Sequence, residues 1–226
     1  MLILGIDTSG KNGGVTLVEA DAQNFRLLGS EPIAGGTFSA QLVPTVAALL
    51  SKNGFSIRAV DGFAVASGPG SFTGLRVGLS AVKGLVEVVQ KPIVTVSLLE
   101  ALASSSLVNG TVVAALDAGR AEVFYGLYKV ADGIAELASE RLLSRQEFLQ
   151  QVQQEEVASV VTSDVALAEA VSAIGAKAEL VERPDSTVVA RIGARKLLAG
   201  EKVAVEALDA NYLRRSDAEI FFKGNR

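Results

Sequence analysis

Residues 67–80 read SGPGSFTGLRVGLS, a glycine-rich bend that opens a helical pattern. The bend follows the apolar, strand-like run Phe63–Ala66, and the helical pattern continues to about Val89. A glycine-rich turn at the start of a helix exposes backbone N–H groups that suit a phosphate. Small residues four positions apart, here Gly74 and Gly78, equally allow another backbone to come close. The stretch therefore predicts a strand–turn–helix unit built for an anion or for close packing.

Apolar runs and helical spacings alternate along the rest of the chain. Strands are expected at residues 2–6, 15–19, 25–31, 63–66, 93–96, 111–116, 122–130 and 159–162. Helices are expected at residues 39–51, from the bend to 89, and at 98–105, 145–153, 165–174 and 187–198. Strands mixed with crossover helices indicate α/β layers.

The polar stretch at residues 104–110 divides the chain into two α/β units, residues 1–106 and 107–226. Both units open with a hairpin in which an Asp ends an apolar strand before a turn of small residues. This echo predicts two related units, each opening with a β-hairpin. It leaves open whether the terminal helix packs back on the first unit.

The composition excludes several kinds of chemistry. The 226 residues include no histidine and no cysteine. A Ser-His-Asp triad, a thiolate nucleophile, a disulfide and a zinc site with nitrogen or sulfur ligands are therefore impossible. The net charge of −4 argues against tight nucleic-acid binding by this chain alone. The start, Met1–Ile6, is typical of a strand and not of a signal peptide, and no apolar stretch is long enough to span a bilayer, so we expect a cytoplasmic protein without membrane contact.

Acidic side chains end the first strand of each hairpin. Asp7 precedes Thr8 and Ser9, and Asp117 stands three residues before Arg120. An Asp in this position can hold hydrated magnesium or orient a water, although a turn in which its carboxylate binds nearby N–H groups is commoner. Two such turns facing one cleft would mark a nucleotide site. These five residues are therefore candidates for the remnant of such a site.

Four motifs together resemble the bacterial TsaB (YeaZ) family over nearly the whole chain. They are ILGIDTS at 3–9, GPGSFTGLRVG at 68–78, LDAGRAEV at 116–123 and YLR at 212–214. The resemblance implies the fold of the actin, sugar-kinase and heat-shock-chaperone superfamily. It also implies a part in making threonylcarbamoyladenosine at position 37 of tRNAs that read codons beginning with adenine.

The resemblance also implies that this chain is a subunit that assembles with a catalytic partner. The partners are the transferase TsaD and the ATPase TsaE, and tRNA is met only through the complex. Leu98 and Leu102 stand where the metal-binding histidines of TsaD would be, so we expect no catalytic residue, no metal and no enzyme activity in this chain. No tightly bound cofactor is expected, and Mg-ATP or ADP is expected only in the assembled complex.

The resemblance places association on the glycine-rich helix, both for a homodimer and for the pair with TsaD. Leucine at position 74 or 78 is then expected to weaken assembly while the monomer stays folded. Arg76 and Lys83 on this helix are candidates for contact with a carboxylate or phosphate, although a solvated charge is commoner. The expected interface residues are Gly70, Ser71, Phe72, Thr73, Gly74, Arg76, Val77, Gly78 and Ala81.

Two alternatives remain open. The fold and the paired Asp turns also allow an ATP-dependent kinase of a small molecule, or an ATPase, although Ala190–Gly193 is a poor substitute for an adenosine-binding Gly-Gly loop. Proteolysis is disfavoured because histidine and cysteine are absent.

The C-terminal tail, Tyr212–Arg226, is basic. It either contacts a partner, such as RNA or an acidic protein, or is a solvated chain end.

Overall fold

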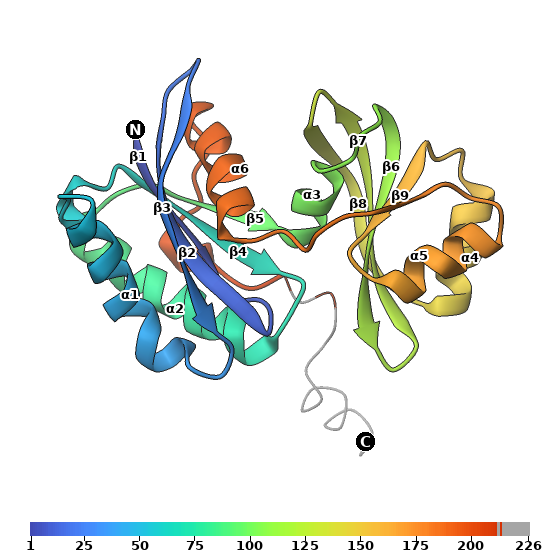
Figure 1. The fold of residues 1–226 in the computed structure, drawn as a ribbon, viewed down its shortest axis with the longest axis horizontal. Helices are drawn as coiled ribbons and strands as arrows, with labels where there is room; N and C mark the ends of the chain where they lie inside the picture. Colours follow the sequence, from blue (N-terminus) through green and yellow to red (C-terminus); the bar gives the residue numbers. More distant parts are fainter. Residues whose placement is uncertain (212, 214–226) are drawn as a thin grey trace. The chain divides into compact units, whose positions relative to one another are not determined.

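The computed structural model describes residues 1–211 and 213, and they form two compact units (Figure 1). The first unit consists of Met1–Leu98 and Pro184–Asn211, and the second is built from Leu99–Arg183. Each unit contains one five-stranded mixed sheet. The chain therefore completes the second unit before it returns to the first.

The two sheets share one topology. In the first sheet the order is β3-β2-β1-β4-β5, and in the second it is β8-β7-β6-β9-β10. In both, three antiparallel strands continue into two parallel ones. The strands are β1 (Leu2–Asp7), β2 (Asn12–Ala20), β3 (Phe25–Ala34), β4 (Gly62–Gly68), β5 (Ile93–Ser97), β6 (Gly110–Gly119), β7 (Glu122–Ala131), β8 (Ile134–Ser144), β9 (Ser159–Thr162) and β10 (Ala178–Leu180). The expected pair of related α/β units, each opening with a hairpin, is confirmed.

Helices cover both faces of the first sheet. The helices α1 (Phe38–Lys52) and α2 (Phe72–Val89) contact each other on one face, and α6 (Ser186–Leu198) packs on the other (Figure 1). Side chains alternate between the faces of a strand. Leu4 and Ile6 of β1 point into the core beneath α1 and α2, whereas a Cβ added at Gly5 would lie 2.6 Å from the Ala190 Cβ of α6. The strand β1 is therefore buried on both faces.

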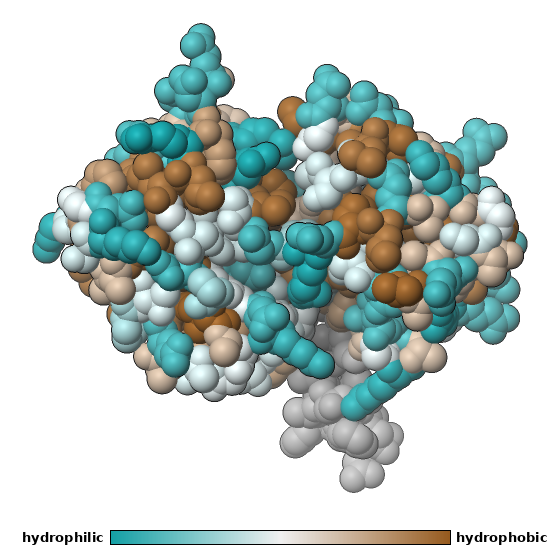
Figure 2. All heavy atoms as spheres, in the orientation of Figure 1, coloured by the Kyte–Doolittle hydropathy of each residue, from teal (hydrophilic) through white to brown (hydrophobic). Residues whose placement is uncertain are grey.

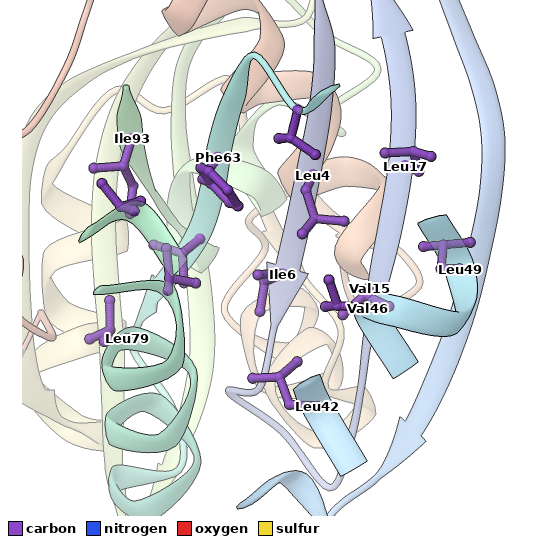
Figure 3. Packing of buried hydrophobic residues seen from close by; sticks show 14 of the residues in the cluster. Leu4, Ile6, Val15, Leu17, Leu42, Val46, Leu49, Phe63, Leu79 and Ile93 are labelled. Atoms are coloured by element: carbon purple, nitrogen blue, oxygen red, sulfur yellow. The ribbon is translucent and has the colours of Figure 1, made fainter. Parts of the chain in front are cut away.

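The core of the first unit lies between the sheet and the α1–α2 pair (Figure 3). It forms because the apolar residues of both helices recur at spacings of three and four, so they line one face of each helix. In Figure 3 these side chains meet those of the strands. The residues labelled there are Leu4, Ile6, Val15, Leu17, Leu42, Val46, Leu49, Phe63, Leu79 and Ile93.

The second unit follows the same plan with shorter helices. The helices α4 (Arg145–Gln154) and α5 (Val165–Ala173) cover one face of its sheet, and α3 (Leu98–Ala103) lies at the other. Its core joins strand residues such as Tyr125 and Val160 to Phe148 of α4 and Leu167 of α5. Short 3₁₀ turns occur at Ile57–Ala59 and Val205–Ala207 in the first unit.

The division of the chain differs from the expected boundary after residue 106. The helix α3 follows β5 as α6 follows β10, so these two helices are counterparts in the repeat. However, α3 follows a strand of the first sheet and packs on the second, where a Cβ added at Gly126 would lie 3.1 Å from the Leu99 Cβ, whereas α6 follows a strand of the second sheet and packs on the first. The chain therefore crosses to the second unit at Leu98, and Pro184–Asn211 belong to the first unit. The polar stretch at 104–110 lies inside the second unit and is not a linker.

Two strands escaped the sequence analysis. The strand β8 is an edge strand whose residues are mostly exposed or half-buried, so it lacks the apolar run that marks a buried strand. The strand β10 has three residues, which is too short for a periodic pattern.

Candidate functional site

The glycine-rich bend leads from the end of β4 into α2, as the sequence predicted. Ser71 caps the helix, because its side-chain oxygen accepts a hydrogen bond from the Gly74 N–H at 3.2 Å. Leu75 and Leu79 in the first half of α2, with Val82 and Val86 further along, are buried in the core of the first unit. The glycine-rich bend serves either anion binding or close packing, and the direction in which its glycines face distinguishes the two roles.

The glycines of the bend face the chain's own β1–β2 turn. A Cβ added at Gly74 would overlap the Thr8 carbonyl oxygen, and one added at Gly78 would overlap the Thr8 hydroxyl oxygen. A Cβ added at Gly70 would likewise overlap the carbonyl oxygen of Ser9. Gly74 and Gly78 thus form a socket that holds Thr8, and we call it the Thr8 socket.

This orientation corrects one expectation. Leucine at position 74 or 78 was expected to weaken assembly and to leave the monomer folded. The side chain would instead have to occupy the space of Thr8, which is 1% exposed. Overpacking of this kind destabilises the monomer itself. These two glycines therefore serve packing inside the first unit.

Hydrogen bonds join the same turn to α2. The Thr8 hydroxyl donates to the Gly74 carbonyl oxygen at 2.8 Å, and the Ser71 N–H donates to the Ser9 carbonyl oxygen at 2.7 Å. The Asp7 carboxylate accepts the N–H of Ser9 at 2.8 Å, and Asp7 is 2% exposed. The three residues of the turn therefore form a dock for the start of α2, with Asp7 in the Asx turn that is the commoner role of such a residue.

The second candidate turn is more open. Asp117 is exposed, and its carboxylate accepts the N–H of Gly119 at 3.1 Å. Arg120 and Ala121 form the tip of the β6–β7 hairpin, with φ of 55° and 57°. A two-residue hairpin turn of this kind needs positive φ at both positions. Among the five nucleotide-site candidates, the structure brings together Asp7, Thr8 and Ser9 in one unit and Asp117 and Arg120 in the other, and their nucleotide role stays a prediction.

The expected interface residues separate into an outer and an inner group. Phe72, Thr73 and Arg76 are exposed at the start of α2, where the Arg76 guanidinium carbon lies 3.8 Å from the centre of the Phe72 ring. Val77 and Ala81 are half-buried against the core. The exposed group continues along α2 through Ser80, Gly84 and Val88, which were not among the expected interface residues.

Together the exposed residues of α1 and α2 form a surface of mostly small and apolar residues. The helix α1 carries one charged residue, Lys52 in its last turn, and apart from Gln41 its other exposed positions are small or apolar, whereas α2 exposes Arg76 and Glu87. Figure 2 shows white, beige and brown spheres, with teal patches between them, over the part of the first unit where Figure 1 draws these helices. We call this the α1–α2 outer surface, and it comprises Ala40, Val43, Pro44, Ala47, Ala48, Thr73, Ser80, Gly84 and Val88.

The sequence analysis missed the α1 half of this surface. The signal was present, because the positions of α1 that alternate with its core residues carry alanine, valine and proline where charged residues are usual. Arg191 and Gly193, of the segment considered for an adenosine loop, lie in α6. A Cβ added at Gly193 would overlap Ala64 of β4, so that glycine serves helix–sheet packing.

The positions compared with a metal site are apolar and buried. Leu98 is 1% exposed and Leu102 is fully buried. Within residues 1–211 and 213, no group of three or more acidic residues is placed to hold a metal ion. In the same part of the chain, no helix has the length and apolar character needed to cross a membrane. Tyr212 and Arg214 of the YLR motif, and the basic tail after them, lie outside the described residues.

Known proteins resemble this chain in sequence. The family described as "TsaD: tRNA N6-adenosine threonylcarbamoyltransferase" matches residues 32–219. The tRNA threonylcarbamoyladenosine biosynthesis protein TsaB of Bacillus subtilis is 33% identical over 137 residues, which are 60% of this chain and 58% of that protein. The Escherichia coli protein of the same name is 33% identical over 134 residues, 57% of this chain and 55% of that protein. The matched region thus spans little more than half the length of these curated relatives.

Solved structures resemble it over most of the chain. YeaZ from Pseudomonas aeruginosa is 26% identical, with a TM-score of 0.72 over 92% of this chain and 98% of that one. A further Pseudomonas aeruginosa structure, described as similar to peptidase YEAZ, gives a TM-score of 0.74 at 26% identity, over 94% of this chain and 99% of that one. The expected fold class, that of the actin, sugar-kinase and heat-shock-chaperone superfamily, is confirmed. The chain belongs to the tRNA N6-adenosine threonylcarbamoyltransferase (TsaD) family and, within it, to the TsaB (YeaZ) proteins.

Proposed function

We propose that this chain is a non-catalytic subunit in the formation of threonylcarbamoyladenosine at position 37 of tRNAs that read codons beginning with adenine. It pairs with a TsaD-type transferase and helps to recruit a TsaE-type ATPase. The names of the Bacillus subtilis and Escherichia coli relatives support the pathway. The match to the TsaD family over residues 32–219 supports a partner of the same fold.

The α1–α2 outer surface is the observation that carries the proposal. Charged residues are depleted from the centres of protein interfaces because their desolvation is costly. Along α1 and α2 the exposed residues are mostly alanine, serine, threonine, valine and glycine, so two helices of a partner can approach closely at little desolvation cost. Arg76 and Phe72 lie at one end, and both residue types are common anchors at interfaces.

The lack of histidine and cysteine supports an accessory role. The chain offers no histidine or cysteine, and leucines occupy the two positions compared with the TsaD metal site. Asp7 is engaged in its own turn beneath α2. We therefore place the transfer chemistry on the TsaD-type subunit, and Mg-ATP or ADP only in the assembled complex.

The same surface can hold a second copy of this chain when the partner is missing. A homodimer through the α1–α2 outer surface would compete with the pair, since both would bury the same residues. The net charge of −4 supports contact with tRNA only through the complex.

Reconstitution tests this function. Purified chain, TsaD-type subunit and TsaE-type subunit from one organism are combined with tRNA and the threonylcarbamoyl adenylate. We expect modified adenosine only when this chain and the TsaD-type subunit are both present, and none from this chain alone. The variant Ala47→Arg, on the α1–α2 outer surface, should lower the yield. Full modification by the other two subunits without this chain would contradict the proposal.

An ATP-dependent kinase of the same fold is the alternative. The paired Asp turns are its support, but each carboxylate accepts an N–H of its own turn. Calorimetry of the isolated chain with Mg-ATP separates the two functions. Binding in the micromolar range would favour the kinase, and heat at the level of dilution would favour the accessory subunit.

A further inference from the structure

One polar side chain supports the N-terminal half of α2. Where Gly74 and Gly78 face inward, no side chain of the helix separates its backbone from the β1–β2 turn. Thr8 fills that space, and its hydroxyl donates to the Gly74 carbonyl oxygen at 2.8 Å in a fully buried setting. The backbone of α2 at Gly74 and Gly78 therefore lies in direct contact with Thr8 of the β1–β2 turn.

The start of α2 has polar contacts in addition to its apolar ones. Leu75, Leu79, Val82 and Val86 hold the helix against the core along its length. At the first turns, the Thr8 hydroxyl bond and the Ser71 N–H bond to the Ser9 carbonyl oxygen are added to the apolar contact of Leu75. Hydrogen bonds depend on both distance and angle. The β1–β2 turn therefore fixes the depth and orientation of the helix start in a way that apolar contacts alone do not.

We propose that Thr8 is a positioning residue for the α1–α2 outer surface. Thr73 and Ser80 lie on the outer side of the turns whose inner side rests on Thr8. Because a helix moves as a rigid element, a lift of about 0.5 Å beneath Gly74 displaces these outer residues by a similar amount, and a gap of that size forfeits about a quarter of a van der Waals contact. This inference rests on the proposed function, since it assigns Thr8 a role in the same association.

Matched variants separate positioning from simple stability. Thr8→Val keeps the shape of the side chain and removes the hydroxyl, whereas Thr8→Ser keeps the hydroxyl and removes a methyl group. Thr16→Val is the control, because the Thr16 hydroxyl is also buried in the first unit. That hydroxyl lies 2.8 Å from the Ser186 Oγ and 2.9 Å from the Ser30 Oγ, on the α6 side of the sheet. Each variant is titrated with the TsaD-type subunit at a temperature at which circular dichroism shows it folded.

The expected result is a specific pattern of affinities. Thr8→Val should bind the TsaD-type subunit at least about tenfold more weakly, while Thr8→Ser and Thr16→Val stay within about threefold of the unchanged chain. Equal binding by Thr8→Val, or an equal loss in Thr16→Val, would overturn the inference. If Thr8→Val does not fold, Thr8→Ala removes the same hydroxyl without added bulk and takes its place under the same criteria.

Hydrogen exchange provides a readout that needs no partner. The amides of residues 74–79 should exchange faster in Thr8→Val than in Thr16→Val when both are compared with the unchanged chain. Failure of the unchanged chain to bind the TsaD-type subunit would reject the proposed function, whereas unaltered exchange at 74–79 in Thr8→Val would reject the positioning role.

Discussion

The β4–α2 segment of the first unit and the β9–α5 segment of the second occupy the same place in two sheets of identical strand order. The helix α2 has 18 residues and opens on a glycine-rich bend, whereas α5 has nine residues and contains no glycine. Asp164 caps α5 by accepting the Leu167 N–H at 3.1 Å. The two units thus share one strand order, but they differ in the residues that start the helix and in the contacts beneath that start.

The hairpin turns of the two units differ in the same sense. Asp7 is 2% exposed in a turn that docks under α2, whereas Asp117 is exposed in a turn with a positive-φ tip. In the first unit the glycines remove the side chains that would keep turn and helix apart. The glycine-rich bend therefore has an internal role in the first unit, and the opposite side of α2 faces outward.

The largest expected effect comes from filling the Thr8 socket. Gly74→Ala places a Cβ on the Thr8 carbonyl oxygen, so we expect a loss of about 3 kcal/mol in the free energy of unfolding. Gly84→Ala, on the exposed side of the same helix with open space around it, should gain up to about 1 kcal/mol from helix propensity. Urea unfolding measures both, and equal values for the two variants would contradict the inward packing of Gly74 against Thr8.

Substitution of the two aspartates should lower the free energy of unfolding by different amounts. Removal of the Asp7 carboxylate in Asp7→Ala leaves a buried Ser9 N–H without its partner, and we expect a loss of about 2 kcal/mol. Asp117→Ala leaves the Gly119 N–H exposed to water, so we expect a loss of about 0.5 kcal/mol in the free energy of unfolding. Thermal unfolding of the pair tests this, and a larger loss for Asp117→Ala would reverse our assignment of the buried turn as the structural one.

The helix caps should show the smallest difference. Asp164→Ala and Ser71→Ala each remove a side-chain acceptor at a helix start, at a cost of about 1 kcal/mol. Only the Asp164 cap carries a charge that the helix dipole stabilises, so the stabilisation that this cap provides should decline as salt is added. Unfolding in low and high salt measures the difference, and a salt effect of equal size in both variants would remove the distinction.

Much of this fold could be predicted from the sequence because its signals are local. Buried strands such as Leu2–Asp7 give continuous apolar runs, and the helices show regular apolar spacing. The exchange of α3 and α6 between the units could not be predicted, since it depends on contacts between segments far apart in the chain.

The site was only half predictable for a similar reason. The sequence showed that Gly74 and Gly78 permit a close approach, but not which backbone approaches. Their place beside Leu75 and Leu79, on the side of α2 that faces the core, was the available signal for an internal contact. The residues that we propose for association lie on the opposite side, where Ser80 and Gly84 are small and exposed but were not among the expected interface residues.

The central claim is that the outer side of α2 binds the TsaD-type subunit. The most direct test is the dissociation constant of that subunit for Ser80→Arg and for Ser172→Arg, which place the same bulky charge on exposed serines of α2 and α5. We predict that Ser80→Arg weakens binding by at least about tenfold while Ser172→Arg binds within about threefold of the unchanged chain. Unchanged binding by Ser80→Arg, with both variants folded, would contradict the claim.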